Sequence, residues 1–133
     1  ESRTFGVVVD TSGSMSAKQI GMALGSIASY AAAKDVPFVR IIFCDAKATD
    51  AGYLAPEDIA GRVKVTGRGG TILQPGVDCL EQANDFPKDG PILIITDGEI
   101  ENDLKVRREH AFLLPRGNRL PFRARGEVFY FRE

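Results

Sequence analysis

Short apolar runs alternate along the chain with segments in which apolar residues recur every three or four positions. Thr4 to Asp10 and Pro91 to Thr96 are near-continuous apolar runs rich in β-branched residues. Runs of this kind are typical of strands that are covered on both faces of a parallel sheet. The first run ends on a carboxylate, Asp10, and the second is followed directly by another, Asp97.

The segment from Ser16 to Lys34 has the helical repeat, with Ile20, Leu24, Ile27 and Ala31 on one face. Ser16 followed by Gln19 three positions later forms a capping-box signature at its start. Phe38 to Cys44 is a second apolar strand, and Pro37 closes the connection before it. Strand, helix and strand in this order predict a right-handed parallel crossover.

The remaining pattern predicts smaller elements. Ala46 to Ala55 consists of small and polar residues, with Tyr53 and Leu54 as its only large apolar pair, and suits a short edge strand with a turn. Pro56 to Arg62 suits a short helix with proline in its first position. Thr66 to Thr71 is a glycine-rich loop, and the residues after it repeat at helical spacing. That second long helix carries Leu73, Val77, Leu80 and Ala83; two later strands are expected at His110 to Leu114 and Val128 to Phe131, separated by a loop from Pro115 to Gly126.

These elements predict one three-layer α/β domain over residues 1–133, with a mainly parallel sheet flanked by helices and one antiparallel edge strand. The length of 133 residues and the 44% hydrophobic content suit one domain with one core. No apolar run approaches the roughly 18 residues that a transmembrane helix needs, so we expect no membrane partner. The chain does not begin with methionine, so we expect it to be a domain of a longer chain or a processed product.

Charged residues are distributed unevenly along the chain. The net charge is only −1, but residues 1–104 hold 9 basic and 15 acidic residues, whereas residues 105–133 hold 8 basic and 3 acidic ones. Two cysteines, Cys44 and Cys79, are too few for a disulfide framework. We therefore expect a reducing, cytoplasmic compartment.

The two strand-end carboxylates are the candidate chemistry. Ligands bind open parallel sheets outside the carboxyl ends of the strands, where both Asp10 and Asp97 are expected. Ser12 and Ser14 follow Asp10 at two-residue intervals, which allows the three side chains to point to one side. Thr71, at the end of the glycine loop, supplies a third hydroxyl. The sequence thus predicts five oxygen ligands from three segments.

An all-oxygen set of this kind suits Mg²⁺ or Mn²⁺ and does not suit zinc, which prefers histidine and cysteine. Two carboxylates neutralise a divalent ion, and the set leaves part of an octahedral shell open. We expect a partner protein to complete the shell with an Asp or Glu carboxylate. The predicted function is accordingly Mg²⁺-dependent protein binding, and we expect no enzymatic activity from this domain.

Asp10, Ser12, Ser14, Thr71 and Asp97 resemble, in order, the metal-ion-dependent adhesion site of von Willebrand factor A (VWA) domains, all five positions of which are filled. The settings Val-Val-Val-Asp-Thr-Ser-Gly-Ser-Met, Gly-Gly-Thr and Ile-Ile-Thr-Asp-Gly are similar to those of the family. The chain most resembles a compact version that ends bacterial proteins whose preceding region looks like a metallopeptidase. Phrases similar to Phe112-Leu-Leu-Pro and Pro121-Phe, with Gly126-Glu-Val after them, recur there. This resemblance implies that residues 1–133 are the C-terminal part of a longer chain. The resemblance implies partner proteins, ring ATPases or other domains of the same chain among them.

Other interpretations stay open at this point. Either aspartate alone suits a helix cap or a turn. A hydrolase or phosphatase using the same metal is the alternative function, although a dehalogenase-type phosphatase needs a second Asp where Ser12 stands. His110, the only histidine, is interpreted as structural, and no H-E-x-x-H, C-x-x-C or P-loop motif occurs.

Two charged segments also have competing interpretations. Glu99, Glu101 and Asp103 follow Asp97 and are expected to form a solvated loop, with an acidic rim around the metal as the alternative. The arginines of the last loop surround Phe122, as in some nucleic-acid modules. We favour a loop that faces another domain or a partner over nucleic-acid binding for these residues, which are Arg116, Arg119, Arg123 and Arg125.

Overall fold

A computed structural model of the protein describes residues 4–12, 15–62 and 72–132. Its centre is a six-stranded sheet with the strand order β3-β2-β1-β4-β5-β6. The strands are β1 (Gly6–Asp10), β2 (Val39–Cys44), β3 (Ala48–Leu54), β4 (Ile92–Ile95), β5 (His110–Pro115) and β6 (Glu127–Phe131). Only β3 runs antiparallel to its neighbour, and it lies at an edge of the sheet. The predicted fold class, mainly parallel with one antiparallel edge strand, is confirmed.

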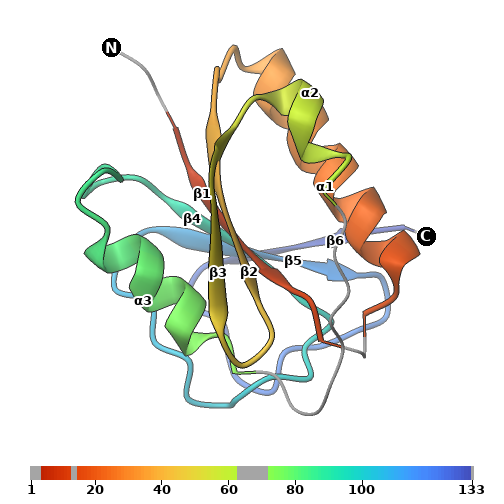
Figure 1. Ribbon diagram of the computed structural model, residues 1–133. Coiled ribbons are helices and arrows are strands. Elements are labelled where there is room, and N and C mark those ends of the chain that lie inside the picture. Colours follow the sequence, from red (N-terminus) through yellow and green to blue (C-terminus); the bar gives the residue numbers. More distant parts are fainter. Residues whose placement is uncertain (1–3, 13–14, 63–71, 133) are drawn as a thin grey trace.

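Helices cover both faces of this sheet (Figure 1). The helix α1 (Ala17–Ala33) and the short helix α2 (Pro56–Ile59) pack on each other on one face, and α3 (Gln74–Gln82) lies on the other. Ser16 and Gln19 form the predicted capping box at the start of α1. The helix predicted over residues 56–62 ends earlier, at Ile59, after which the chain turns.

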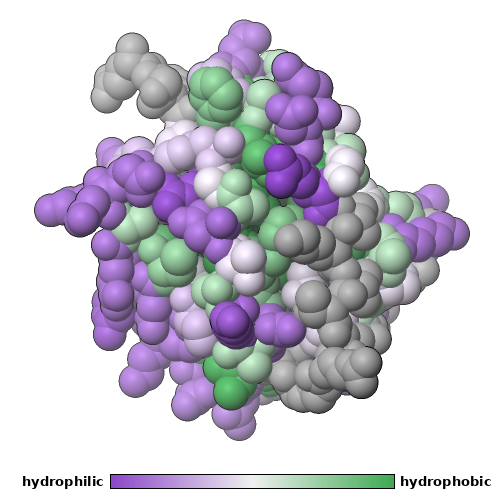
Figure 2. Space-filling model, viewed as in Figure 1, coloured by the Kyte–Doolittle hydropathy of each residue, from purple (hydrophilic) through white to green (hydrophobic). Residues whose placement is uncertain are grey.

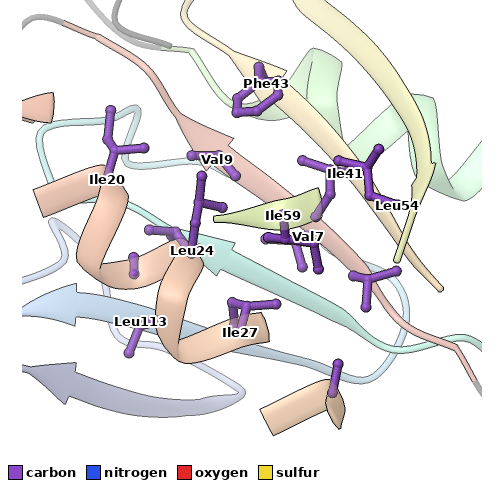
Figure 3. Close-up of a cluster of buried hydrophobic side chains, with 14 of the residues drawn as sticks. Val7, Val9, Ile20, Leu24, Ile27, Ile41, Phe43, Leu54, Ile59 and Leu113 are labelled. Carbon is purple, nitrogen blue, oxygen red and sulfur yellow. The ribbon is translucent and has the colours of Figure 1, made fainter. Parts of the chain in front are cut away.

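The core divides into two clusters because successive side chains of a strand point to opposite faces. Val7 and Val9 of β1 pack under α1, whereas Val8 between them packs under α3. Figure 3 shows the first cluster, in which side chains of α1 face the strands. Its labelled members are Val7, Val9, Ile20, Leu24, Ile27, Ile41, Phe43, Leu54, Ile59 and Leu113. Burial of each aliphatic side chain stabilises the fold by roughly 1.5–3 kcal/mol.

The second half of the sheet is connected without helices. The β4–β5 connection, residues 96–109, and the β5–β6 connection, residues 116–126, contain turns and bends but no helix, although both join parallel strands. Apolar side chains of these loops pack on the α3 side of the sheet; they include Ile100, Leu104, Leu120 and Phe122. The loops therefore take the place that a helix usually has in a parallel crossover.

The surface seen from the side of Figure 1 is hydrophilic along most of its outline, with hydrophobic side chains between (Figure 2). Among the described residues, no helix combines the length and the apolar character that crossing a bilayer requires.

Candidate metal centre

Parallel pairing of β1 and β4 brings the two candidate carboxylates to one edge of the sheet. Val9 of β1 lies opposite Ile95 of β4, so that Asp10 and Asp97 follow at the same carboxyl edge. Both side chains belong to buried residues, with exposed fractions of 0% for Asp10 and 3% for Asp97. This register agrees with the prediction that both aspartates lie at the carboxyl ends of their strands.

Asp10 is held by its neighbours through both oxygens. The backbone N–H of Ser12 donates to Oδ1 at 2.9 Å, and the hydroxyl of Thr96 donates to Oδ2 at 2.8 Å. Ser12 itself is buried, and the N–H of Thr11 bonds to the carbonyl of Cys44 on β2. The turn after β1 is thus fixed against two neighbouring strands.

The electrostatic setting of Asp10 is unfavourable for its charge. Burial raises the pKa of the Asp10 carboxyl above its usual value, and the nearby negative charge of Asp97 adds to the increase. Hydrogen bonds from Ser12 and Thr96 act in the opposite direction on this pKa. A cation bound between the two carboxylates would relieve both the burial cost and their mutual repulsion.

Asp97 is positioned by the loops around it. Its Oδ1 accepts from the N–H of Glu99 at 3.0 Å, and its backbone carbonyl accepts from the side-chain amide of Asn118 at 3.0 Å. Gly98 has a φ of +93°, and a Cβ at this position would lie 1.8 Å from the carbonyl oxygen of Arg119. Only glycine fits such a close approach of two backbones. The β5–β6 connection therefore closes directly over the residue that follows Asp97.

Glu101 is a structural carboxylate that the sequence placed in a solvated loop or an acidic rim. It accepts hydrogen bonds from the N–H groups of Leu73 and Gln74, all at 2.9 Å, at the start of α3. No side chain of the N-cap residue itself serves this helix. The β4–β5 loop that carries Asp97 is thereby attached to the segment just after Thr71 in the chain.

The structure brings Asp10, Ser12 and Asp97 to one place, while Ser14 and Thr71 lie outside the described residues. Within the described ranges, no group of three or more His, Cys, Asp or Glu side chains has the arrangement of a metal site. The described donors are two carboxylates and one hydroxyl, all hard oxygens. Their chemistry fits Mg²⁺ or Mn²⁺ with waters in the shell.

Thr96, Asn118 and Glu101 are the supporting residues that sequence reasoning missed. Thr96 had a signal, because it is the polar residue directly after the buried strand β4 and lies one position before the candidate ligand. Asn118 and Glu101 had none, since their contacts join segments that are 21 and 28 positions apart in the chain.

His110 and the cysteines do not belong to this centre. The ring nitrogen Nδ1 of His110 lies 2.8 Å from the carbonyl of Arg108, and the ring packs against Phe112. Cys44 and Cys79 are both free thiols, and burial raises the pKa of Cys44 to about 11. Such a thiol stays protonated at neutral pH and behaves as a small hydrophobic group.

Comparisons with known proteins agree with this architecture. A family model described as "VWA-like domain (DUF2201)" matches residues 5–108. The crystal structure of an aerotolerance-related membrane protein from Bacteroides fragilis NCTC 9343, with multiple mutations to serines, superposes with a TM-score of 0.56. That match covers 98% of this chain and 77% of that chain at 14% sequence identity, so it supports the fold alone. No curated protein matches the sequence.

Proposed function

The chain belongs to the VWA-like domain family (DUF2201), and we propose that it is a Mg²⁺-dependent protein-interaction domain. Domains of the VWA type commonly mediate protein interactions. In the proposed mechanism, a partner's Asp or Glu carboxylate completes the coordination of an ion held at the carboxyl edge of the sheet. The observation that carries the proposal is the pair of buried carboxylates, Asp10 and Asp97, at that edge.

The chemistry of the donor set supports an ion with an open position. Asp10 and Asp97 supply two negative charges, which balance one divalent cation. Ser12, Ser14 and Thr71 supply neutral hydroxyls that ligate the ion or orient its waters. Because Mg²⁺ prefers six oxygen ligands and keeps water readily, an anionic oxygen from another protein can replace a water.

The hydrogen bonds around Asp10 favour a site in which this ligand is held in place before the ion binds. Thr96 and the N–H of Ser12 fix the carboxylate of Asp10, so that this side chain needs no rearrangement when the ion binds. Preorganised ligands with fixed partners bind metals more tightly than mobile ones. The chain supplies, on this view, a fixed platform, and the partner supplies the last ligand.

We further propose a cytoplasmic setting and a place in a longer chain. The partner is a protein with an exposed acidic side chain, either a separate one, such as a ring ATPase, or another domain of the same chain. Neither a membrane nor a nucleic acid is proposed as a ligand of the metal centre.

Calorimetric titration of Mn²⁺ and Mg²⁺ into the purified domain tests the metal site. We expect saturable binding at one site in the wild type and at least a tenfold loss of affinity in both Ser14→Ala and Asp97→Ala. Glu99→Ala is the matched control, because Glu99 is an exposed acid two positions from Asp97. This variant should bind the ion with the affinity of the wild type. Far-UV circular dichroism checks that each variant is folded.

The outcomes separate the proposal from its rivals. Binding that survives in Asp97→Ala with an intact fold contradicts the ligand assignment. If neither Mg²⁺ nor Mn²⁺ binds to the wild type at millimolar concentration, the proposal that the domain is a metal-dependent module is contradicted. Wild-type binding that is lost in both site variants sends the work to a search for partners with and without Mg²⁺.

We do not propose an enzyme. The alternative, a metal-dependent phosphatase or hydrolase, needs a general acid near Asp10, and Ser12 occupies the position where dehalogenase-type phosphatases have one. Hydrolysis of p-nitrophenyl phosphate in the presence of Mn²⁺ tests this. Activity that disappears in Asp10→Asn would replace the binding proposal with the enzymatic one.

A further inference from the structure

The two loops that replace crossover helices leave a basic groove between them. It has a volume of about 480 Å³ and runs between the segments 104–107 and 122–125 on the α3 side of the sheet. Figure 1 shows both connections as loops. The floor of the groove includes His110 and Phe112, which lie in the amino-terminal half of β5. Asp10 and Asp97, in contrast, lie at the carboxyl edge of the sheet. The groove is thus a separate feature from the metal centre.

Positive charge lines both walls of this groove. Lys105 and Arg107 come from the first loop, and Arg123 and Arg125 come from the second. Arg107 has one weak partner, Glu81 at 3.7 Å, and its side chain is 75% exposed. In the part of the chain that the structure describes, no carboxylate forms an ion pair with Lys105, Arg123 or Arg125. Four cations around one concave site focus a positive potential there.

The floor of the groove consists of packed aromatic and aliphatic side chains together with His110. Phe112 is 1% exposed and meets the partly buried Phe122 edge to face, with ring centroids 5.7 Å apart. Leu104 and Val106 complete the apolar lining. A ligand that fits this arrangement presents one apolar side chain to the floor and anionic groups to the walls.

We propose that this groove binds a short acidic segment of a partner protein. Carboxylates of the segment lie against Lys105, Arg123 and Arg125, and an apolar side chain between them packs on Phe122. The proposal needs no metal ion and does not depend on the metal centre. It assigns a second contact surface to a domain whose family commonly mediates protein interactions.

The charge distribution favours a short acidic peptide over a nucleic acid. The chain has a net charge of −1, and the residues up to 104 carry six more acidic than basic groups. A long polyanion that extends beyond the groove meets this negative remainder, whereas a short segment needs only the local cations. Phe112 is 1% exposed, so Phe122 is the main aromatic ring that the floor offers to a ligand, whereas single-stranded nucleic acids stack successive bases on several aromatic rings.

Fluorescence anisotropy with a labelled peptide tests the proposal. The probe has one phenylalanine between runs of glutamate, and the matched control peptide has glutamine in place of every glutamate. We expect the acidic peptide to bind at low salt, and the glutamine peptide to bind at least about tenfold more weakly. Added sodium chloride should weaken binding of the acidic peptide further, because the contacts are exposed ion pairs.

Charge-reversal variants locate the site. The double variant Arg123→Glu with Arg125→Glu should weaken binding of the acidic peptide by about tenfold or more. The control is Arg116→Glu with Arg119→Glu, which makes the same change of net charge at exposed positions of the same loop outside the groove. It should change the affinity by less than about threefold. Lys105→Gln, on the opposite wall, should weaken binding without altering the arginine loop.

Four results would overturn the proposal. The first is equal affinity for the glutamate and glutamine peptides, and the second is equal loss in the two double variants, which would reflect net charge alone. The third is tighter binding of a labelled single-stranded oligonucleotide than of the peptide, with that binding lost in the same variants. This result would make the groove a nucleic-acid site. The fourth is unchanged binding in Lys105→Gln together with Arg123→Glu and Arg125→Glu. Circular dichroism of each variant verifies the fold.

Discussion

Asp10 shows how a carboxylate can be held in a fixed position at the end of a buried strand. A carboxylate with an exposed fraction of 0% is costly to keep charged, and its raised pKa records that cost. Thr96 and the turn at Ser12 nevertheless hold both oxygens in place. The protein therefore retains a locally unfavourable group in a defined position, a combination that is frequent at functional sites.

Gly98 is the residue for which the local geometry is most restrictive. Replacement of Gly98 by Ala should destabilise the protein by about 3 kcal/mol or more, because the new Cβ would lie 1.8 Å from a backbone oxygen of Arg119 at a positive φ. Gly117 is the matched control, since its φ is also positive, at +94°, but a Cβ added there would have no atom within 4 Å. Gly117→Ala should cost only about 1 kcal/mol. Urea unfolding followed by circular dichroism measures both, and equal losses would contradict the steric argument.

At the scale of elements, α3 and the β4–β5 loop behave as one unit. The helix begins without a side-chain cap of its own, and the carboxylate of Glu101 serves its first N–H groups. The side chain of Gln74 also binds the backbone of Lys105 through two hydrogen bonds of 2.9 and 2.8 Å. Movement of the loop that carries Asp97 is thus coupled to the chain segment that follows Thr71.

Glu101→Ala should weaken this coupling in two measurable ways. Loss of the helix cap should lower the free energy of unfolding by about 1–2 kcal/mol. If the metal centre is as proposed, Mn²⁺ affinity should also fall, because the β4–β5 loop and the start of α3 lose the hydrogen bonds of Glu101 and are held by the Gln74–Lys105 contacts, while all five ligands remain. Glu99→Ala is again the control, as an exposed acid of the same loop whose removal should leave both quantities unchanged. A stability loss with normal Mn²⁺ affinity would limit Glu101 to a structural role.

At the scale of the whole molecule, the sequence predicted the elements and their layers better than the contacts between them. Periodicity identified the buried strands and α1, because apolar patterning follows directly from burial. The strand-end carboxylates followed from the same pattern. The cap by Glu101, the amide of Asn118 and the basic groove did not, because they arise where loops distant in sequence meet. Ser14 and Thr71 stay predictions.

One long-range network fixes the sheet edge to the rest of the protein. Arg40 of β2 is 6% exposed; its Nε donates to Asp50 of β3 at 2.9 Å and its Nη1 to Asp85 at 2.7 Å. The guanidinium also lies over the ring of Tyr53, 5.0 Å from its centroid. A buried guanidinium needs such partners, because an unpaired charge in this position is strongly destabilising.

This network predicts how the stability of the protein depends on pH. Hydrogen bonds from Arg40 lower the pKa of Asp50 below its usual value of 3.8, so the unfolded chain binds more protons at this residue than the folded one. The stabilising contribution is complete at neutral pH, begins to decrease as pH approaches 3.8 from above, and is lost as pH falls through the lowered pKa of the folded state. Asp50 is about one third exposed, so solvent screening keeps the contribution modest.

Asp50→Asn tests the size and the sign of this effect together. At pH 7 the variant should be less stable than the wild type by about 1–2 kcal/mol, since Arg40 keeps its bonds to Asp85 and loses only one charged partner. The difference should shrink as the pH is lowered below about 4 in urea-unfolding experiments, because protonated Asp50 resembles asparagine. Asp89→Asn, at an exposed aspartate that forms no ion pair among the described residues, controls for the change of net charge. A difference between Asp50→Asn and wild type that stays constant down to about pH 3 would mean that Asp50 acts through packing rather than through its charge.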